Sequence, residues 1–183
     1  GNVVNPEDII NKSGADILRL WVATTDYSED MRIGNEVLNN LNDNYRRIRN
    51  TFRFILGNIG ELKSEDCLSY NDLEEIDKYI LSRLYEMHKL REVSIKSHSY
   101  HIFFKSLFEF CSVDLSSFYF DISKDILYCN LLADSKRKCK TTTLFHIYEC
   151  LTNWYVPVLC HTMEEAWKTF KTQPLESVHL KEK

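Results

Sequence analysis

The sequence predicts an all-α protein: an antiparallel helix bundle with a small connector at its N-terminus. Apolar residues recur at steps of three and four over most of the chain, which is the period of an amphipathic helix. Only five Gly and three Pro occur among 183 residues, too few for the many tight turns of a strand-rich fold. Hydrophobic residues make up 44% of the chain, which is enough to bury a substantial core.

Residues 1–34 differ from the rest and predict a connector that lies outside the main core. The residues NPED at 5–8 read as a helix start, because Pro is tolerated in a first turn and acids are favoured there. An apolar run follows at 15–23, and residues 31–33, just before Gly34, are a candidate brief strand.

The bundle is expected over residues 35–175, as four or five helices joined by short loops, and short loops imply antiparallel neighbours. The first helix begins at Asn35 and is expected to end at Gly57 and Gly60. Its buried stripe comprises Val37, Leu38, Leu41, Tyr45, Ile48, Phe52 and Ile55. Asn71 and Glu74 have the spacing of a capping box and are expected to open the second helix.

The later helices follow the same period. A third helix is expected over about 99–118, while residues 122–130 are ambiguous between helix and irregular chain. A fourth helix begins after Asp134 and stops near Pro157. A last helix is expected to be capped by Thr162, and the polar tail at 176–183 is expected to fray.

Six cysteines occur without a CxxC pair, and several lie inside apolar helical patterns. This usage favours buried reduced thiols over a disulfide framework. No apolar run approaches the roughly 20 residues of a membrane span. We therefore expect a cytoplasmic, monomeric protein without membrane contact.

The net charge of −4 argues at first against nucleic acid, but phosphate contacts need only a local basic face. Polar residues gather on a flank beside the apolar stripe of the first helix: Asn39, Asn42, Arg46, Arg49, Asn50 and Arg53. Arginine pairs with phosphates or stacks on bases, and asparagine can read a base edge. From the spacing alone two interpretations are open: an RNA-binding face, or a solvated face that makes ion pairs within the bundle.

A second basic cluster, at the start of the fourth helix, consists of Lys136, Arg137, Lys138 and Lys140. Positive charge at a helix N-terminus opposes the macrodipole, which a phosphate partner would relieve. A flexible solvated loop explains the cluster equally well. Lys124 and Tyr128, just upstream, are candidates to face the same groove as the first flank.

No motif predicts catalysis or metal binding. His98 and His101 have HxxH spacing but no companion ligand at a recognised distance. His146 and His161 are expected as hydrogen-bonded residues at the edge of the core. The chain has no Gly-rich phosphate loop, GxSxG or HExxH. We expect no catalytic residue, no metal ligand and no cofactor in this chain.

Four blocks carry a resemblance to a known family: GADILRLWVATTDYSEDMRI (14–33), YRRIRNTFRFILGN (45–58), DLSSFYFDISKDILYC (114–129) and WYVPVLCHTMEEAW (154–167). They resemble, in the same order, the anticodon-binding region of bacterial isoleucyl-tRNA synthetases, which are class I aminoacyl-tRNA synthetases. The TDYSEDMRI wording is more similar to the isoleucine enzymes than to the related valine, leucine and methionine enzymes. In that family a Gly-Asn pair follows the ATP-site loop KMSKS, so we expect this loop, and the HIGH signature, to lie before Gly1.

The resemblance implies the tRNA anticodon-binding fragment of an enzyme that joins isoleucine to tRNA(Ile) using ATP with magnesium. The fragment alone is expected to be inactive. The resemblance also implies anticodon-loop contacts by Arg46, Arg49, Asn50 and Arg53, with Lys124 as a further candidate. It implies a stem-contact role for residues 14–34. The competing interpretations are a helical scaffold or protein-interaction domain without RNA, and the equivalent domain of a valine or methionine enzyme.

Overall fold

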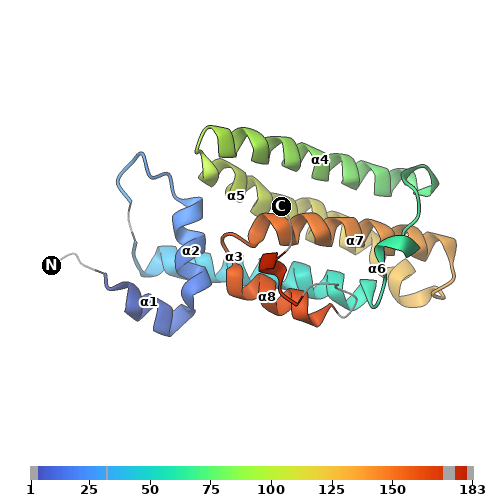
Figure 1. Cartoon of the computed structure of the whole chain (residues 1–183), viewed down its shortest axis with the longest axis horizontal. Coiled ribbons are helices and arrows are strands. Elements are labelled where there is room, and N and C mark those ends of the chain that lie inside the picture. Colours follow the sequence, from blue (N-terminus) through green and yellow to red (C-terminus); the bar gives the residue numbers. More distant parts are fainter. Residues whose placement is uncertain (1–3, 32, 171–175, 181–183) are drawn as a thin grey trace.

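The computed structural model describes residues 4–31, 33–170 and 176–180, and these form helices and loops without a strand. This confirms the predicted all-α class. Four long helical segments lie side by side and alternate in direction, as Figure 1 shows: α3 (Asn35–Ile59), α4 (Glu75–Lys96), the run from α5 to α6, and α7 (Ser135–Tyr155). No helix in the described ranges is both long enough and apolar enough to cross a membrane.

The shorter elements cover the ends and one side of this bundle. The helices α1 (Pro6–Ser13) and α2 (Ala15–Thr24) lie at the end of the bundle where α3 begins (Figure 1). The helix α8 (Cys160–Thr169) packs on α3 and α7. Three 3-10 turns complete the fold: η1 (Ser64–Asp66), η2 (Tyr70–Asp72) and η4 (Val178–Leu180).

The third segment is one continuous helical run made of α5 (Tyr100–Glu109), η3 (Phe110–Tyr119) and α6 (Phe120–Cys129). The ambiguous stretch 122–130 is therefore helical as far as Cys129. The middle part, η3, is π-helical. The hydroxyl of Ser116 donates to the carbonyl of Cys111 (2.8 Å), five residues back, and Ser117 does the same to Ser112 (2.9 Å). These bonds match the wider i to i+5 turn.

The first long helix, α3, has most of the predicted buried stripe but a different end. The prediction was wrong for Val37, which is 36% exposed because the buried part of α3 begins only at Leu41. Ile48, Phe52 and Ile55 are almost completely buried. The helix continues through Gly57 to Ile59, so the expectation that Gly57 helps to end it is wrong. Only Gly60 leaves the helical region, with a φ of 58° that suits glycine.

The capping box expected at the start of α4 is not formed. Asn71 lies in the η2 turn, and Glu74 is the extended residue just before the helix. The Glu74 carboxylate does not reach back along the chain, because it accepts a hydrogen bond from the Lys140 ammonium at 2.8 Å. A long-range ion pair thus replaces the local cap.

The ends of α7 follow the sequence, whereas the start of α8 does not. Asp134 caps α7 by accepting from the Arg137 backbone N–H (3.1 Å), and α7 ends at Tyr155, before Pro157. The prediction that Thr162 caps the last helix is wrong, because α8 already begins at Cys160 and Thr162 lies in its first turn.

The connector is more closely packed than the sequence predicted. Asn5 caps α1 as expected, accepting from the Glu7 backbone N–H at 3.1 Å. However, Ile17 and Leu20 of α2 are buried in the main hydrophobic core, so this segment does not lie outside it. The division of the chain at Gly34 stays a prediction.

Two expectations for irregular segments also change. In the candidate strand 31–33, Met31 and Ile33 have no regular structure, and residue 32 lies outside the described residues. In the tail, Val178 is buried in the core and its backbone N–H donates to Glu164 (3.1 Å), so this part is anchored rather than frayed. Residues 171–175 and 181–183 lie outside the described residues.

A buried ion pair joins three segments at the end of the bundle away from α1. The Lys140 ammonium is 2% exposed and contacts both carboxylate oxygens of Asp77, at 2.9 and 3.1 Å. Asp77 is fully buried and also accepts the Tyr119 hydroxyl at 2.5 Å. Burial, together with the Asp77 charge, raises the pKa of Tyr119 far above its usual value. These contacts connect α7, α4 and η3.

We predict that Lys140→Met destabilises the fold strongly, because it leaves the Asp77 carboxylate buried without its cation. The free energy of unfolding from urea titration should fall by about 3–5 kcal/mol. The matched control is Lys138→Met, an exposed position on the same helix, which should stay within about 0.5 kcal/mol of wild type. Adding Asp77→Leu to Lys140→Met should restore much of the loss, whereas a loss near zero for Lys140→Met would refute a structural role for the pair.

Candidate RNA-binding site

The polar flank of α3 lies where the sequence predicted it. The buried stripe of α3 faces the core, so the positions on its outer side form a line along the helix. Arg46, Asn50 and Arg53 occupy successive turns of this line and are exposed, and Arg49 lies beside them, toward α8. We call these four residues the α3 flank.

Two arginines of the α3 flank make surface ion pairs. Arg46 contacts Asp43 at 3.0 Å and Arg49 contacts Glu165 of α8 at 3.1 Å. Their side chains remain 72% and 48% exposed, and exposed pairs of this kind contribute little to stability. Both guanidinium groups therefore stay exchangeable with an incoming phosphate.

Asn50 and Arg53 are the members of the α3 flank that remain unengaged. Within the described part of the chain, neither side chain makes a hydrogen bond or an ion pair, and both are exposed. They line two adjoining hollows, one of about 400 Å³ between α3 and α8 and one of about 390 Å³ between α3 and α6. We call these the α8-side hollow and the α6-side hollow.

Asn42 is occupied within the fold. Its amide nitrogen donates to the Leu38 carbonyl at 2.9 Å and to the Ser13 hydroxyl of α1 at 3.5 Å. The side chain is half-buried, so it helps to join α1 to α3. Its use as an RNA contact would require these bonds to break.

Lys124 is not brought to the α3 flank by any contact. It lies on α6 and pairs with Asp121 at 2.6 Å, and this hydrogen bond raises the pKa of the Lys124 ammonium. Tyr128, one turn further along α6, does line the α6-side hollow. Of the two candidates on this helix, the geometry favours the tyrosine.

The second basic cluster is smaller at the surface than in the sequence. Lys140 is buried in the ion pair with Asp77, and Arg137 turns back to donate to the Asn130 carbonyl at 2.6 Å. Lys136 and Lys138 are exposed. The Asp134 carboxylate at the N-cap offsets the unfavourable charge that these lysines place at the helix start.

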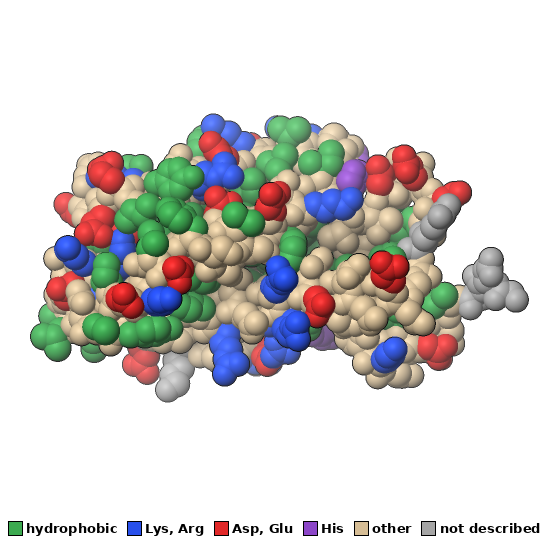
Figure 2. Space-filling view, turned by 180° about the vertical axis from the view of Figure 1, so that it is seen from behind, with side chains coloured by type: hydrophobic (Ala, Val, Ile, Leu, Met, Phe, Trp, Pro, Cys, Tyr) green, Lys and Arg blue, Asp and Glu red, His purple; other side chains and the backbone are tan. Residues whose placement is uncertain are grey.

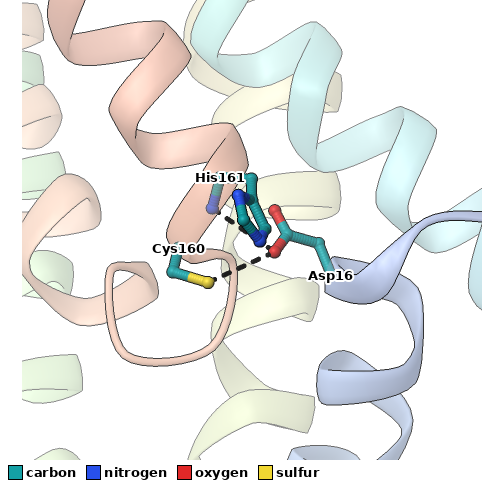
Figure 3. A group of neighbouring side chains, drawn as sticks. All are labelled: Asp16, Cys160 and His161. Atoms are coloured by element: carbon teal, nitrogen blue, oxygen red, sulfur yellow. Dashed lines mark hydrogen bonds between the residues drawn. The ribbon is translucent and has the colours of Figure 1, made fainter. Parts of the chain in front are cut away.

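Asp16, Cys160 and His161 bring three potential metal-ligating atoms within 4.8 Å of one another (Figure 3). The Asp16 carboxylate is already bound: it accepts from the Thr162 backbone N–H (2.8 Å) and hydroxyl (2.6 Å), the His161 N–H (3.4 Å) and the Cys160 thiol (3.6 Å). This is the geometry of a helix cap supplied by another helix. The positive end of the α8 dipole favours an anion there and disfavours a cation.

A second residue of α2 joins the same turn. Arg19 donates to the carbonyls of Pro157 (2.6 Å) and Val158 (3.0 Å), just before α8. Asp16 and Arg19 together fix the α7–α8 turn to the connector. Of the two histidines with HxxH spacing, His101 has its Nε2 atom 3.5 Å from an Asp26 carboxylate oxygen, and His98 has a φ of 57°.

Comparisons with known proteins identify the family to which the chain belongs. A sequence model described as "Anticodon-binding domain of tRNA ligase" matches residues 77–182, which is more than half of the chain. The chain belongs to this family of anticodon-binding domains. A model described as "tRNA synthetases class I (I, L, M and V)" matches residues 1–34, the connector that holds α1 and α2.

The relatives of this anticodon-binding domain are longer proteins. It is 44% identical over 185 residues to an isoleucine–tRNA ligase of Pelagibacter ubique and 44% identical over 183 residues to one of Syntrophotalea carbinolica. A relative of the same name from Gluconobacter oxydans is 43% identical over 180 residues. The alignments cover 98–100% of this chain, and the chain spans only about a fifth of each relative.

The sequence pattern missed several residues that shape the hollows. Gly57, which the sequence predicts only as a helix end, and Glu165 both line the α8-side hollow. Phe54 and Asn58 help to line the α6-side hollow. The signal that would have found Gly57 is its position: it continues the line of Arg46, Asn50 and Arg53 by one more turn.

We predict that Asp16→Ala destabilises the anticodon-binding domain, because it removes the cap of α8 and leaves buried N–H donors unpaired. The loss should be about 1–2 kcal/mol in urea unfolding. Asp8→Ala, at an exposed position in α1, is the control and should have little effect.

The same proteins test the alternative role of this cluster. If Asp16, Cys160 and His161 serve as a cap, Zn²⁺ or EDTA should leave the melting temperature unchanged. A rise with Zn²⁺ in the wild type that Asp16→Ala abolishes would establish a metal site instead.

Proposed function

We propose that this domain binds the anticodon loop of tRNA(Ile) through the α3 flank, as part of an isoleucine–tRNA ligase. The observation that carries the proposal is the pair Asn50 and Arg53, which are exposed and unengaged within the described chain, beside two hollows. Membership of the anticodon-binding family gives the class of partner.

The chemistry of the flank suits single-stranded RNA. Guanidinium groups pair bidentately with phosphates and stack on bases, and a free amide can both donate to and accept from a base edge. On the face seen in Figure 2, Lys and Arg side chains are interleaved with Asp and Glu, without a broad basic surface. Any RNA binding on this face would therefore depend on a few local contacts.

The choice of isoleucine rests on the relatives. The class I model covers four kinds of synthetase, whereas the similar full-length proteins are named isoleucine–tRNA ligases. We infer that the parent protein attaches isoleucine to its tRNA with ATP and magnesium, and that it works in the cytoplasm as a monomer. The present chain spans about a fifth of these relatives.

The connector would help to position the tRNA relative to the rest of the parent protein. We infer that residues 14–34 contact the tRNA stem between the anticodon loop and the acceptor end. Because Asp16 and Arg19 join α2 to the α7–α8 turn, a stem contact on the connector and a loop contact on the α3 flank would keep a fixed spacing. Such positioning of the substrate contributes to catalysis without a chemical step.

Fluorescence anisotropy tests the proposal directly. Labelled tRNA(Ile) is titrated with the 183-residue chain at low salt, beside the same tRNA with a changed anticodon. We expect tighter binding to the natural anticodon and a loss of affinity as salt rises. Equal binding to both RNAs would refute anticodon reading, and the absence of binding would favour the helical scaffold.

We predict that Arg53→Ala and Asn50→Ala each weaken tRNA(Ile) binding by about 1–3 kcal/mol while helicity is retained. Arg53→Ala should also reduce the slope of log K against log salt by about 1, because one phosphate contact is lost. Arg46→Ala should have a smaller effect, because Arg46 must give up its ion pair with Asp43 in order to bind a phosphate and so gains less from that contact.

The matched control for these variants is Arg47→Ala. Arg47 is exposed on the same helix but lines neither hollow. Its replacement changes net charge as much as Arg53→Ala does and should leave affinity nearly unchanged. Equal losses at both positions would mean that only overall charge matters.

A further inference from the structure

Gly57 is a glycine that the fold itself does not require. It lies inside α3, is exposed and does not have a positive φ. Apart from its two chain neighbours and the adjacent backbone of α3, a Cβ built on it would meet no heavy atom of the described residues within 4 Å. Glycine inside a helix lowers stability relative to alanine, so neither the backbone nor the packing explains its presence.

The position of Gly57 suggests what it leaves room for. It continues the line of Arg46, Asn50 and Arg53 on the outer side of α3, and it lines both the α8-side and the α6-side hollow. The surface of α3 is therefore bare at the point where the two hollows meet. Glycine at such a point permits the close approach of a ligand to the backbone.

An exposed aromatic ring stands on one side of this bare point. Tyr128 is 65% exposed and meets Phe54 edge to face, with ring centroids 6.4 Å apart. Phe54 in turn stacks on Phe120 at 4.2 Å. Half-buried Phe54 and buried Phe120 thus support a tyrosine that still offers most of its own surface.

The polar groups around the α6-side hollow suit a nucleobase. Asn58 uses its amide nitrogen on the Phe54 carbonyl (2.8 Å), which leaves its amide oxygen as an acceptor. Asn50 and Arg53 supply further donors. Among the described residues, none of those that line this hollow is acidic, whereas Glu165 lines the α8-side hollow. The α6-side hollow is therefore the better place for part of an anionic chain.

We propose that the α6-side hollow binds one unstacked base of the RNA loop, stacked on Tyr128, with the sugar–phosphate chain passing over Gly57. Arg53, at the rim of both hollows, holds the adjoining phosphate. The proposal rests on the proposed function and adds the place at which a base is held. An aromatic ring, a guanidinium and free amides around one hollow are the groups by which proteins bind unpaired bases.

We call the proposed binding site for one base in the α6-side hollow the base slot. The substitution Gly57→Gln tests it, because its effects on the stability of the fold and on RNA binding should be opposite. Gly57→Gln introduces a better helix former, so the melting temperature should stay the same or rise by about 2–4 °C. Its side chain would fill the bare point, and affinity for a fluorescein-labelled anticodon stem-loop of tRNA(Ile) should fall about 10-fold. A structural glycine would instead give a lower melting temperature.

Substitutions of Tyr128 provide the second test of the base slot. Tyr128→Leu keeps an apolar side chain but removes the ring, and it should weaken binding of the stem-loop about 10-fold. Tyr128→Phe keeps the ring and should stay within about 2-fold of wild type, since stacking needs no hydroxyl. The control is Tyr85→Leu, at a tyrosine of α4 that is 58% exposed and lines neither hollow.

Abasic nucleotides identify the bound base. Each loop position is made abasic in turn, and binding is measured with wild type and with Tyr128→Leu. At one position the two changes should not add, because each removes the same stack. Additive losses at every position would overturn the base slot.

The outcomes separate the two proposals. If Arg53→Ala weakens binding while Gly57→Gln and Tyr128→Leu do not, the α3 flank binds RNA and the base slot is refuted. If the wild type binds no RNA, both proposals fail. If Gly57→Gln and Tyr128→Leu weaken binding and the abasic cycle finds one non-additive position, the slot is established.

Discussion

The placement of α8 depends on one buried carboxylate that belongs to another helix. Asp16 accepts from the backbone and hydroxyl of Thr162, and its charge lies at the positive end of the α8 dipole. The Thr162 hydroxyl also lies 2.8 Å from the hydroxyl of Tyr45 on α3, so hydrogen bonds join α2, α8 and α3 in one corner. Glu165, one turn further along α8, forms a wall of the α8-side hollow. The connector thereby fixes part of the surface on which the proposed RNA contacts lie.

A second buried charge decides which basic residues reach the surface. Lys140 is committed to Asp77 and Glu74, and removing it from the cluster at the start of α7 leaves a pair of exposed lysines, Lys136 and Lys138. The buried pair holds α7 to α4 at the end of the bundle where α6 also finishes (Figure 1). A count of basic residues in sequence therefore overstates the charge available to a phosphate, and the α3 flank is left as the more extensive polar surface.

Local patterns predicted much of the fold, and long-range contacts account for the failures. The buried stripe of α3 from Leu41 onward and the start of α7 after Asp134 depend on neighbours within a few residues, so local patterns predicted them. The cap of α8 comes from a residue 146 positions away, and the Lys140 partner lies 63 positions away, which no local pattern contains. The same distinction between local patterns and long-range contacts applies to the candidate RNA-binding site. The outer side of α3 could be predicted from its stripe, but the engagement of Asn42 by Leu38 and Ser13 depends on packing.

A chain with a net negative charge can still bind RNA if some of its exposed basic side chains are not held in ion pairs. Exposed ion pairs are worth about 0–1 kcal/mol, so exchanging Asp43 or Glu165 for a phosphate leaves Arg46 and Arg49 with little net gain. Arg53 makes no ion pair within the described residues and gains the full contact. Under the proposed function, phosphate binding by this surface would therefore depend mainly on Arg53, and its salt dependence should be shallow. Discrimination between loops must then come from groups that meet bases, and a stacked ring beside free amides supplies recognition without adding charge.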